Sequence, residues 1–168
     1  HGQPNPLAEL PLQFSDYALW QNHLLENHLL DKQLDYWRNE LADAPLLLGL
    51  PTNRPRPPLQ TFQGKQLAFS VPAELAAKLG IIARSHNVSV FMLLLASYQL
   101  LLAQLCKQRD VCVGIPRDGR FRKELEPLAG FFINALVIRT RIDQQASLGE
   151  LLAAVREKTL HAFANELV

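Results

Sequence analysis

The sequence predicts an α/β fold in which helices are layered against a sheet. Hydrophobic residues make up 48% of the 168 residues and charged residues 20%, as is usual for chains that bury a core. Five segments carry apolar residues at helical spacing, and three shorter segments have strand character. The expected order is helix, helix, strand, helix, helix, strand, strand, helix. This length fits one ordinary domain or one lobe of a larger one.

Two helices are predicted near the start of the chain. The first begins near Ser15 or Asp16, because either side chain can accept hydrogen bonds from the free amides of a helix N-terminus. Its apolar residues recur at helical spacing, namely Tyr17, Trp20 and Leu24. The second opens after Asp31 and has the same spacing at Leu34, Trp37 and Leu41. Each helix therefore carries one apolar stripe.

The middle of the chain predicts a connection, a strand and two helices. Residues 50–58 are proline-rich and are expected to form a surface connection. Residues 66–71 alternate apolar and polar side chains, which is the period of a half-buried strand. A helix is predicted to begin at Pro72, since proline fits the first helical turn. Ser89 is expected to cap the next helix, 90–105, whose nearly uniform apolarity predicts cover on most sides.

The last third predicts two strands and a closing helix. Residues 110–115 and 130–141 are rich in β-branched side chains, which favours strands. The polar segment 116–127 between them is predicted to be a loop. Ser147 and Glu150 match a capping box, so the closing helix is expected to begin there.

Several classes of function are not favoured by the composition. The net charge of +1 gives no field that would attract nucleic acid or an anionic membrane. The apolar tract 90–105 is shorter than the about 20 residues that a bilayer span needs, and polar side chains interrupt it. Cys106 and Cys112 are interpreted as two free thiols, which predicts a reducing, cytoplasmic location.

Metal binding is not predicted either. No two of the five histidines stand four residues apart, and no Cys-x-x-Cys pair occurs. Arg117, Arg120 and Arg122 form a basic cluster in the 116–127 loop. They are either solvated and partly neutralised by nearby acids, or they are an anchor for a phosphate or an acidic partner.

Asn134 is the one carboxamide in an otherwise apolar strand. Leaving such a group unpaired away from water costs about 1–3 kcal/mol, so something must bond to it. The partner is either a neighbouring protein group, or a substrate amide that passes through a cavity lined by this side chain. The residues by themselves leave both alternatives open.

The chain nevertheless resembles a known family over nearly its whole length. The resemblance is carried by six strings in a specific order: FSDYALWQ (14–21), QLDYWRNELADAPLLLGLPTNRPRP (33–57), FSVPAELAAKL (69–79), VSVFMLLLASYQLLLAQL (88–105), DVCVGIPRDGR (110–120) and LAGFFINALVIRT (128–140). They are similar to the condensation domain of nonribosomal peptide synthetases. Phe14–Gln21 corresponds to that family's Y-x-D-[FY]-A-x-W-Q motif, and Ala129–Arg139 corresponds to its [IL]-G-x-F-[VI]-N-T-x-x-x-R motif.

The resemblance implies a chloramphenicol acetyltransferase-like fold of two α/β lobes with a tunnel between them. Carrier domains dock at the two ends of that tunnel and deliver substrates on phosphopantetheine arms, and no cofactor is bound directly. The acceptor amine attacks the donor thioester to form an amide. The family's H-H-x-x-x-D-G motif is not in this sequence, so residues 1–168 are expected to be the second lobe, inactive without the first.

The resemblance also implies roles for individual residues. Asn134 is expected to support the tunnel, either by orienting the acyl chain or by holding neighbouring loops. Trp37 is expected either to pack the lobe so that the tunnel wall stays in place or to serve the core alone. Arg139 is expected either to pair with a carboxylate across the lobes or to be solvated at the strand end. Phe14 stands where the family usually has Tyr, so any role of that hydroxyl is lost. No general base is assigned in this chain. The alternatives are a non-catalytic module that binds carrier domains, or an acyltransferase that uses free coenzyme A.

Overall fold

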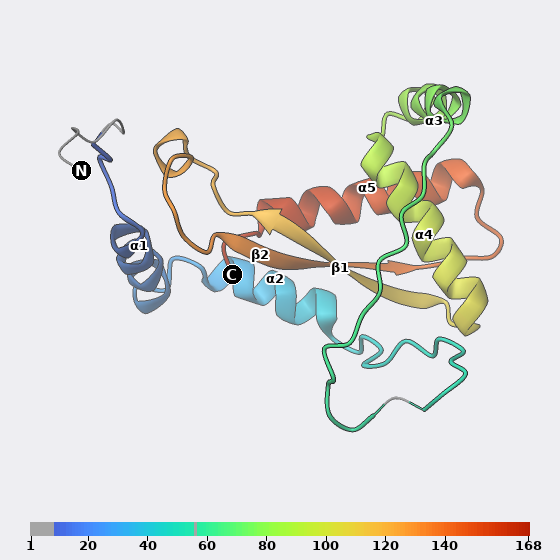
Figure 1. The fold of residues 1–168 in the computed structure, drawn as a ribbon, viewed down its shortest axis with the longest axis horizontal. Coiled ribbons are helices and arrows are strands. Elements are labelled where there is room, and N and C mark those ends of the chain that lie inside the picture. The colour runs from blue at the N-terminus through green and yellow to red at the C-terminus, as the bar shows by residue number, and fades with distance from the viewer. Residues whose placement is uncertain (1–8, 56) are drawn as a thin grey trace, which may run out of the picture. The chain divides into compact units, whose positions relative to one another are not determined.

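The structure, a computed structural model, describes residues 9–55 and 57–168 and has the predicted α/β character (Figure 1). In chain order the elements are α1 (Phe14–Glu26), α2 (Asp31–Leu41), α3 (Ala73–Ser85), α4 (Val90–Cys106), β1 (Asp110–Asp118), the short 3-10 helix η1 (Lys123–Leu125), β2 (Ile133–Arg141) and α5 (Leu148–Ala164).

β1 and β2 form a two-stranded antiparallel sheet within the described part of the chain. The amide of Gly119 donates to the carbonyl of Phe132 at 2.9 Å beyond one end of the ladder. Beyond the other end, the amide of Ile142 donates to the carbonyl of Arg109 at 2.6 Å. The register therefore pairs the start of one strand with the end of the other.

The strand predicted over residues 66–71 is not formed, and this prediction is wrong. Residues 57–72 contain neither helix nor strand, and Leu67 and Phe69 are 87% and 84% exposed. A strand is held by hydrogen bonds to a neighbouring strand, and none of the described strands pairs with this segment. Alternating side chains alone were therefore not sufficient to make a strand.

The helix starts show which local signals were correct. The hydroxyl of Ser89 accepts from the amide of Met92 at 3.1 Å, which confirms the predicted cap of α4. Ser147 and Glu150 form the predicted capping box, with the amide of Ser147 donating to the Glu150 carboxylate at 2.8 Å. Helix α1 was expected to be capped at Ser15 or Asp16, which is two or three residues later than observed. Its N-cap is Gln13, and Asp16 accepts from that residue's amide at 2.8 Å.

The described chain divides into two compact units, each with its own core. The first comprises residues 9–42, 114–137 and 162–168, and the second comprises residues 43–113 and 138–161. In the first unit, Tyr17 of α1 packs with Leu125, Leu128 and Phe132. Aromatic rings dominate this core, and the ring centroids of Tyr17 and Phe132 are 4.8 Å apart. The loop between β1 and β2 is thereby tied to α1.

The core of the second unit joins α4 to the adjacent strand ends. Leu102 and Ala103 of α4 are buried with Val111 and Ile142. Gln99 is fully buried beside them, where its amide nitrogen donates to the carbonyl of Ile138 at 2.9 Å. Its oxygen accepts from the Thr140 hydroxyl at 3.0 Å, so α4 is fixed to β2 by polar as well as apolar contacts.

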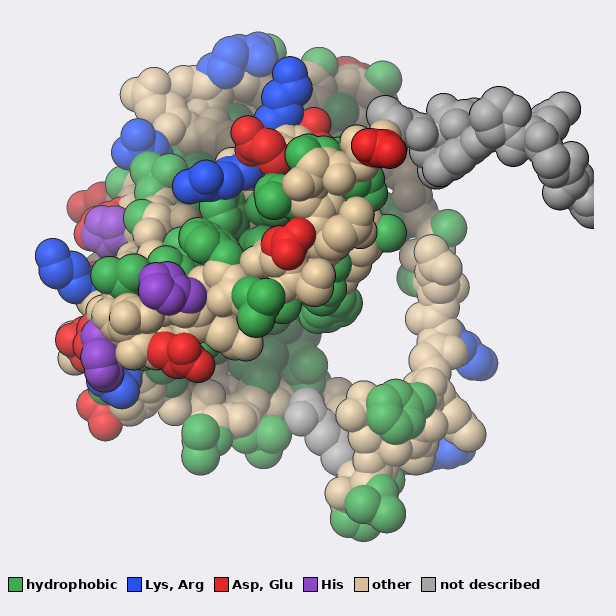
Figure 2. Space-filling view, turned by 90° about the vertical axis from the view of Figure 1, so that its left-hand side faces the viewer, with side chains coloured by type: hydrophobic (Ala, Val, Ile, Leu, Met, Phe, Trp, Pro, Cys, Tyr) green, Lys and Arg blue, Asp and Glu red, His purple; other side chains and the backbone are tan. Residues whose placement is uncertain are grey.

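The predicted cover over most of α4 is not observed within the described residues. One face of the helix is buried, whereas the opposite face is 44–50% exposed at Val90, Phe91, Leu94, Tyr98, Leu101 and Leu105. Figure 2 views the molecule from the side of α1, where hydrophobic side chains also lie at the surface. No single described helix meets the length and hydropathy needed to cross a bilayer; α3 and α4 meet them only jointly, with a 98° bend between them.

Candidate functional site

Asn134, near the start of β2, lines a cavity of about 260 Å³ in the first unit. The cavity wall also includes polar and charged side chains from α1, β1 and the end of the chain, among them Gln21, Arg117 and Glu166. Phe131 and Phe132 supply apolar surface. The carboxamide is therefore not enclosed in close packing. A fully enclosed carboxamide could not take part in a site.

The carboxamide of Asn134 is bonded to backbone groups. Its nitrogen donates to the carbonyl oxygens of Glu166 at 2.8 Å and Val168 at 3.0 Å. Its oxygen accepts from the amide of Ala135 at 2.8 Å. Both donor hydrogens are thus used, and only a second lone pair on the oxygen is left for a ligand. The sequence left open whether Asn134 bonds to neighbouring protein groups or to a substrate amide. In this structure its partners are neighbouring protein groups.

Residues 165–168 receive further bonds from α2. The indole nitrogen of Trp37 donates to the carbonyl of Asn165 at 2.8 Å. The amide of Leu167 donates to the side-chain oxygen of Gln33 at 3.0 Å. Gln33 begins one of the strings that carry the resemblance, but it was not singled out as a site residue, because its partner is 134 positions away.

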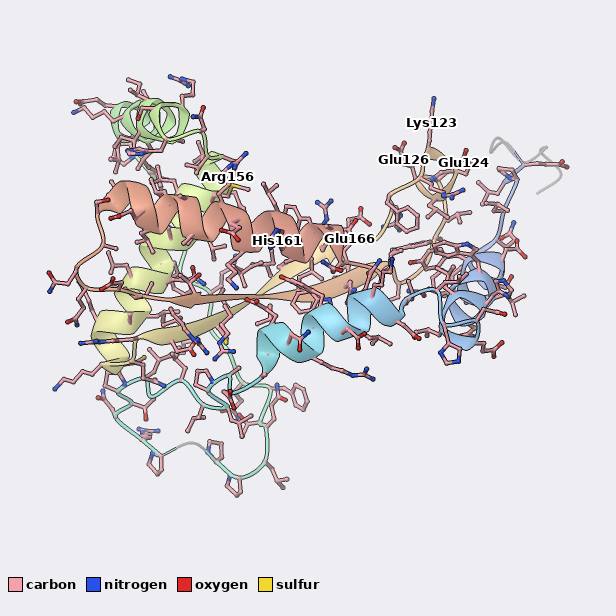
Figure 3. All side chains as sticks on the ribbon, turned by 180° about the vertical axis from the view of Figure 1, so that it is seen from behind. Lys123, Glu124, Glu126, Arg156, His161 and Glu166 are labelled. Carbon is pink, nitrogen blue, oxygen red and sulfur yellow. The ribbon has the colours of Figure 1, made fainter. Side chains whose placement is uncertain are left out.

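Arg117 of β1 binds the same segment through charge. Its Nε lies 2.5 Å from a carboxylate oxygen of Glu166, whose side chain is only 15% exposed. Its guanidinium carbon lies 4.5 Å from the ring centroid of Phe163, close enough for a cation–π contact. Figure 3 shows Glu166 beyond the end of α5. Arg117, predicted as a phosphate or carrier contact, is therefore already paired with an acid in this structure.

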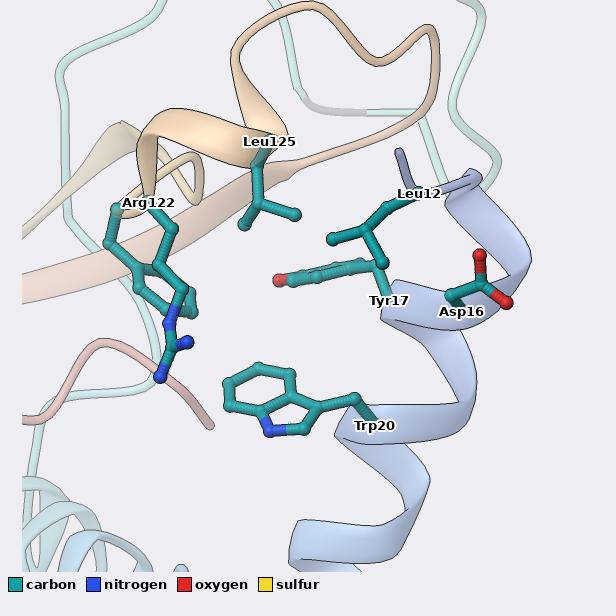
Figure 4. Close-up of a pocket in the computed structure, with 7 residues that line it drawn as sticks. Leu12, Asp16, Tyr17, Trp20, Arg122 and Leu125 are labelled. Atoms are coloured by element: carbon teal, nitrogen blue, oxygen red, sulfur yellow. The ribbon is translucent and has the colours of Figure 1, made fainter. Parts of the chain in front are cut away.

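The other two arginines of the basic cluster differ from each other. Arg120 donates to Asp118 at 3.1 Å and to the carbonyl of Leu128 at 3.2 Å, and it lies 4.2 Å from the Phe132 ring centroid. Arg122 is exposed and lines a smaller cavity of about 180 Å³ (Figure 4). Three charged neighbours occupy the turn that follows, namely Lys123, Glu124 and Glu126 (Figure 3).

Phe14 packs behind the wall of the Asn134 cavity. Its ring meets that of Phe132 edge-on, with centroids 5.2 Å apart, and Phe132 lines the cavity. Gly130 allows this packing, since a Cβ there would lie 2.2 Å from Cδ2 of the Phe14 ring. Phe14 thus supports the wall through Phe132.

Arg139 belongs to the second unit and is paired within this chain. Its guanidinium binds the carboxylate of Asp110 on β1, whereas the family resemblance implies a carboxylate of another lobe. Adjacent strands bring the two residues together, which the separation of 29 positions had hidden. The hydrogen bond from Arg139 is the main cause that lowers the pKa of Asp110 below its usual value, and Arg141 adds to it, while burial opposes the shift.

No group of three or more His, Cys, Asp or Glu side chains within residues 9–55 and 57–168 is arranged to hold a metal ion. The two cysteines, Cys106 and Cys112, are half-buried and form no disulfide. Around Asn134 the described residues offer hydrogen-bonding groups, the Arg117–Glu166 ion pair and apolar surface.

Comparisons of the sequence with family models and with known proteins agree on one family. A family model described as the condensation domain matches residues 1–168. The chain is 44% identical over 165 residues to one of the linear gramicidin synthase proteins of Brevibacillus parabrevis, covering 98% of this chain and 3% of that protein. It is 39% identical over 160 residues to phosphinothricin tripeptide synthetase PhsC of Streptomyces viridochromogenes, covering 95% of this chain and 15% of that protein.

Solved structures share the fold. The X-domain from teicoplanin biosynthesis matches 99% of this chain and 38% of its own chain, with a TM-score of 0.90 and 29% identity. The SgcC5 protein from Streptomyces globisporus matches 98% of this chain and 37% of its own, with a TM-score of 0.80 and 31% identity. The chain thus spans well under half the length of these proteins.

Proposed function

This chain belongs to the condensation-domain family, and we propose from that premise that it is the second lobe of a domain that forms amide bonds in nonribosomal peptide synthesis. The observation that carries the proposal is the family match over residues 1–168, joined to identities of 44–45% with linear gramicidin synthases. Its substrates would be acyl or aminoacyl groups held as thioesters on carrier proteins.

The proposed reaction is aminolysis of a thioester. The acceptor amine attacks the donor carbonyl carbon, a C–N bond forms, and the C–S bond breaks. The departing thiolate takes up the proton that the amine gives up and is released as the free thiol. Such a reaction depends on holding the amine and the thioester in line and on stabilising the developing charge. We assign no acid–base catalyst within residues 1–168.

The proposal includes partners and a compartment. The phosphopantetheine arms belong to upstream and downstream carrier domains, and the first lobe of the same domain would complete the tunnel. Arg122 is our preferred carrier contact in the basic cluster, since Arg117 and Arg120 already bind Glu166 and Asp118. Two cysteines outside any disulfide fit a reducing cytoplasm.

The supporting roles follow from the contacts described above. Asn134 and Trp37 would keep the cavity wall in place through the backbone of residues 165–168. Phe14 would support the same wall through Phe132. Arg139 would keep β1 and β2 in register through Asp110.

Reconstitution tests the proposal. A complete condensation domain that contains this chain, mixed with a loaded donor carrier and a loaded acceptor carrier, should yield the amide on the acceptor arm. Residues 1–168 alone should yield none, because half of the tunnel is missing. Mass spectrometry of the carrier-bound products measures both. Absence of product from the complete domain would contradict the amide-forming role, and product from residues 1–168 alone would contradict the two-lobe arrangement.

A recruiting role is the second candidate. A solved complex of the teicoplanin X-domain and OxyB also matches this fold, with a TM-score of 0.90. A degenerate domain would bind loaded carriers or a partner enzyme with no amide product. Binding of a loaded carrier by the complete domain, with no turnover over hours, would favour this role over catalysis.

A further inference from the structure

We infer that four residues, Gln33, Trp37, Arg117 and Asn134, act together as positioning residues that fix residues 165–168 as one wall of the Asn134 cavity. We call them the anchoring residues. The inference deepens the proposed function and rests on it, because the process that the wall would serve is the amide-forming reaction. It assigns a role to Gln33 and gives Arg117 a different role from carrier binding.

The anchoring residues come from three different elements and converge on one short segment. Gln33 and Trp37 are one helical turn apart on α2, so both project from the same face of that helix. Arg117 comes from β1 and Asn134 from β2. Residues 165–168 are thus held from α2 and from the sheet.

The bonds use complementary groups of the segment. The indole of Trp37 can only donate, and it is matched to the Asn165 carbonyl. The Gln33 oxygen accepts from the Leu167 amide, and both hydrogens of the Asn134 amide go to carbonyls of the segment. One backbone group of each residue from 165 to 168 is therefore given a partner of the correct type.

The ion pair adds a charged bond to these neutral ones. Glu166 is 15% exposed at its side chain, so its bond to Arg117 is partly shielded from solvent. Phe163 lies against the guanidinium at the end of α5, which restricts the Arg117 side chain further.

The consequence concerns the cavity. Glu166 and Leu167 belong to its lining together with Asn134 and Arg117. A segment without helix or strand bonds of its own would otherwise move, and the cavity would change shape with it. Placement of a reacting group depends on such walls, and an error of about 1 Å can cost about a hundredfold in rate.

The experiment uses the complete condensation domain with three loss variants. Gln33→Leu removes the acceptor for the Leu167 amide. Asn134→Asp keeps the oxygen that faces Ala135 but removes both donors. Trp37→Phe removes only the indole N–H and keeps a ring beside Tyr36, whose centroid lies 5.0 Å from that of Trp37.

Two matched controls accompany them. Gln33→Glu keeps an acceptor oxygen and should restore the bond to Leu167. Gln108→Leu removes a comparable pair of side-chain bonds to a loop backbone, those to Gly49 and Leu47 in the second unit, and leaves every bond to residues 165–168 in place. Thermal melting of every variant excludes unfolded protein from the comparison.

Amide hydrogen exchange at Leu167 is the first readout. Gln33→Leu should raise its exchange rate about tenfold, as loss of one hydrogen bond predicts. Asn134→Asp should raise it too, whereas Gln33→Glu and Gln108→Leu should leave it near wild type. Unchanged exchange in both Gln33→Leu and Asn134→Asp would overturn the anchoring itself.

Condensation kinetics are the second readout. The three loss variants should lower kcat about tenfold with little change in KM for either carrier, because the wall affects alignment and not docking. Gln33→Glu should recover most of the rate. Faster exchange at Leu167 with unchanged kcat would overturn the positioning role. Absence of product from the wild-type domain would instead refute the proposed function, a result that the variants cannot imitate.

Discussion

The guanidinium of Arg139 and the carboxylate of Asp110 form a two-point ion pair between β2 and β1. Nε lies 2.9 Å from Oδ1 and Nη2 lies 2.6 Å from Oδ2. Arg139 is only 5% exposed, so water screens little of this interaction. The pair fixes the register of the two strands at the end of the sheet that belongs to the second unit.

Replacing Arg139 is expected to destabilise the domain strongly. Arg139→Ala leaves a partly buried carboxylate without its main partner, and we expect a loss of about 2–3 kcal/mol in the free energy of unfolding. Urea denaturation of the condensation domain measures it. The control is Arg141→Ala, since Arg141 contacts the same carboxylate at 3.3 Å but is 72% exposed. It should cost under about 1 kcal/mol. Equal losses of unfolding free energy in Arg139→Ala and Arg141→Ala would contradict the claim that burial makes the Arg139 pair the stronger one.

The same pair predicts a pH dependence. The pKa of Asp110 is lowered by Arg139, so the ionised pair stabilises the fold above the unfolded carboxyl pKa of about 4. This stabilisation should disappear as the pH falls from there through the lower pKa of the folded state. The difference in unfolding free energy between wild type and Asp110→Asn should therefore be large at pH 7 and shrink below about pH 4. A difference that is constant with pH would contradict it.

The buried Gln99 predicts a coupled pair of substitutions. Gln99→Leu leaves the Thr140 hydroxyl and the Ile138 carbonyl without this partner in a dry core, and about 1–3 kcal/mol of stability should be lost. Adding Thr140→Val should cost less than the sum of the two single losses, because the hydroxyl is then gone as well. Urea denaturation of the four proteins of this cycle gives the coupling energy. Strict additivity would show that the two side chains do not depend on each other.

Gly119 is expected to reject a larger residue. A Cβ there would lie 2.6 Å from the carbonyl oxygen of Phe132, a backbone atom that also accepts the Gly119 amide. Gly119→Ala should therefore lower stability by about 1–3 kcal/mol, as overpacking usually does. Gly114→Ala on β1 is the control, because nothing lies within 4 Å of its added Cβ. It should change stability by no more than about 0.5 kcal/mol, measured by thermal melting.

The features of the fold that depend on residues close together in the sequence were predictable. Ser89 and the Ser147–Glu150 pair marked two helix starts correctly, since a cap acts within three or four residues of the chain. β1 and β2 were located by their β-branched residues, although β1 extends to Asp118, three residues beyond its expected end. The ordered motifs also pointed to the family that the comparisons identify.

The site was only partly predictable. Asn134 was noticed because a carboxamide in an apolar strand requires a partner, and that argument needs no coordinates. Its partners could not be named, because they lie 32 and 34 positions away. Gln33 was not singled out, although it begins one of the strings that carry the resemblance, and the alternating pattern of residues 66–71 was misleading.

Local preferences were enough to predict the α/β character and the helix starts at Ser89 and Ser147, and the order of motifs was enough to indicate the family. Which polar groups meet depends on the folded arrangement, since the Trp37 indole donates to a carbonyl 128 positions later. The folded arrangement also left residues 66–71 without a strand. The physical reason is the same in both cases: a hydrogen bond between distant segments exists only where folding brings a donor and an acceptor together, and no local pattern encodes that distance.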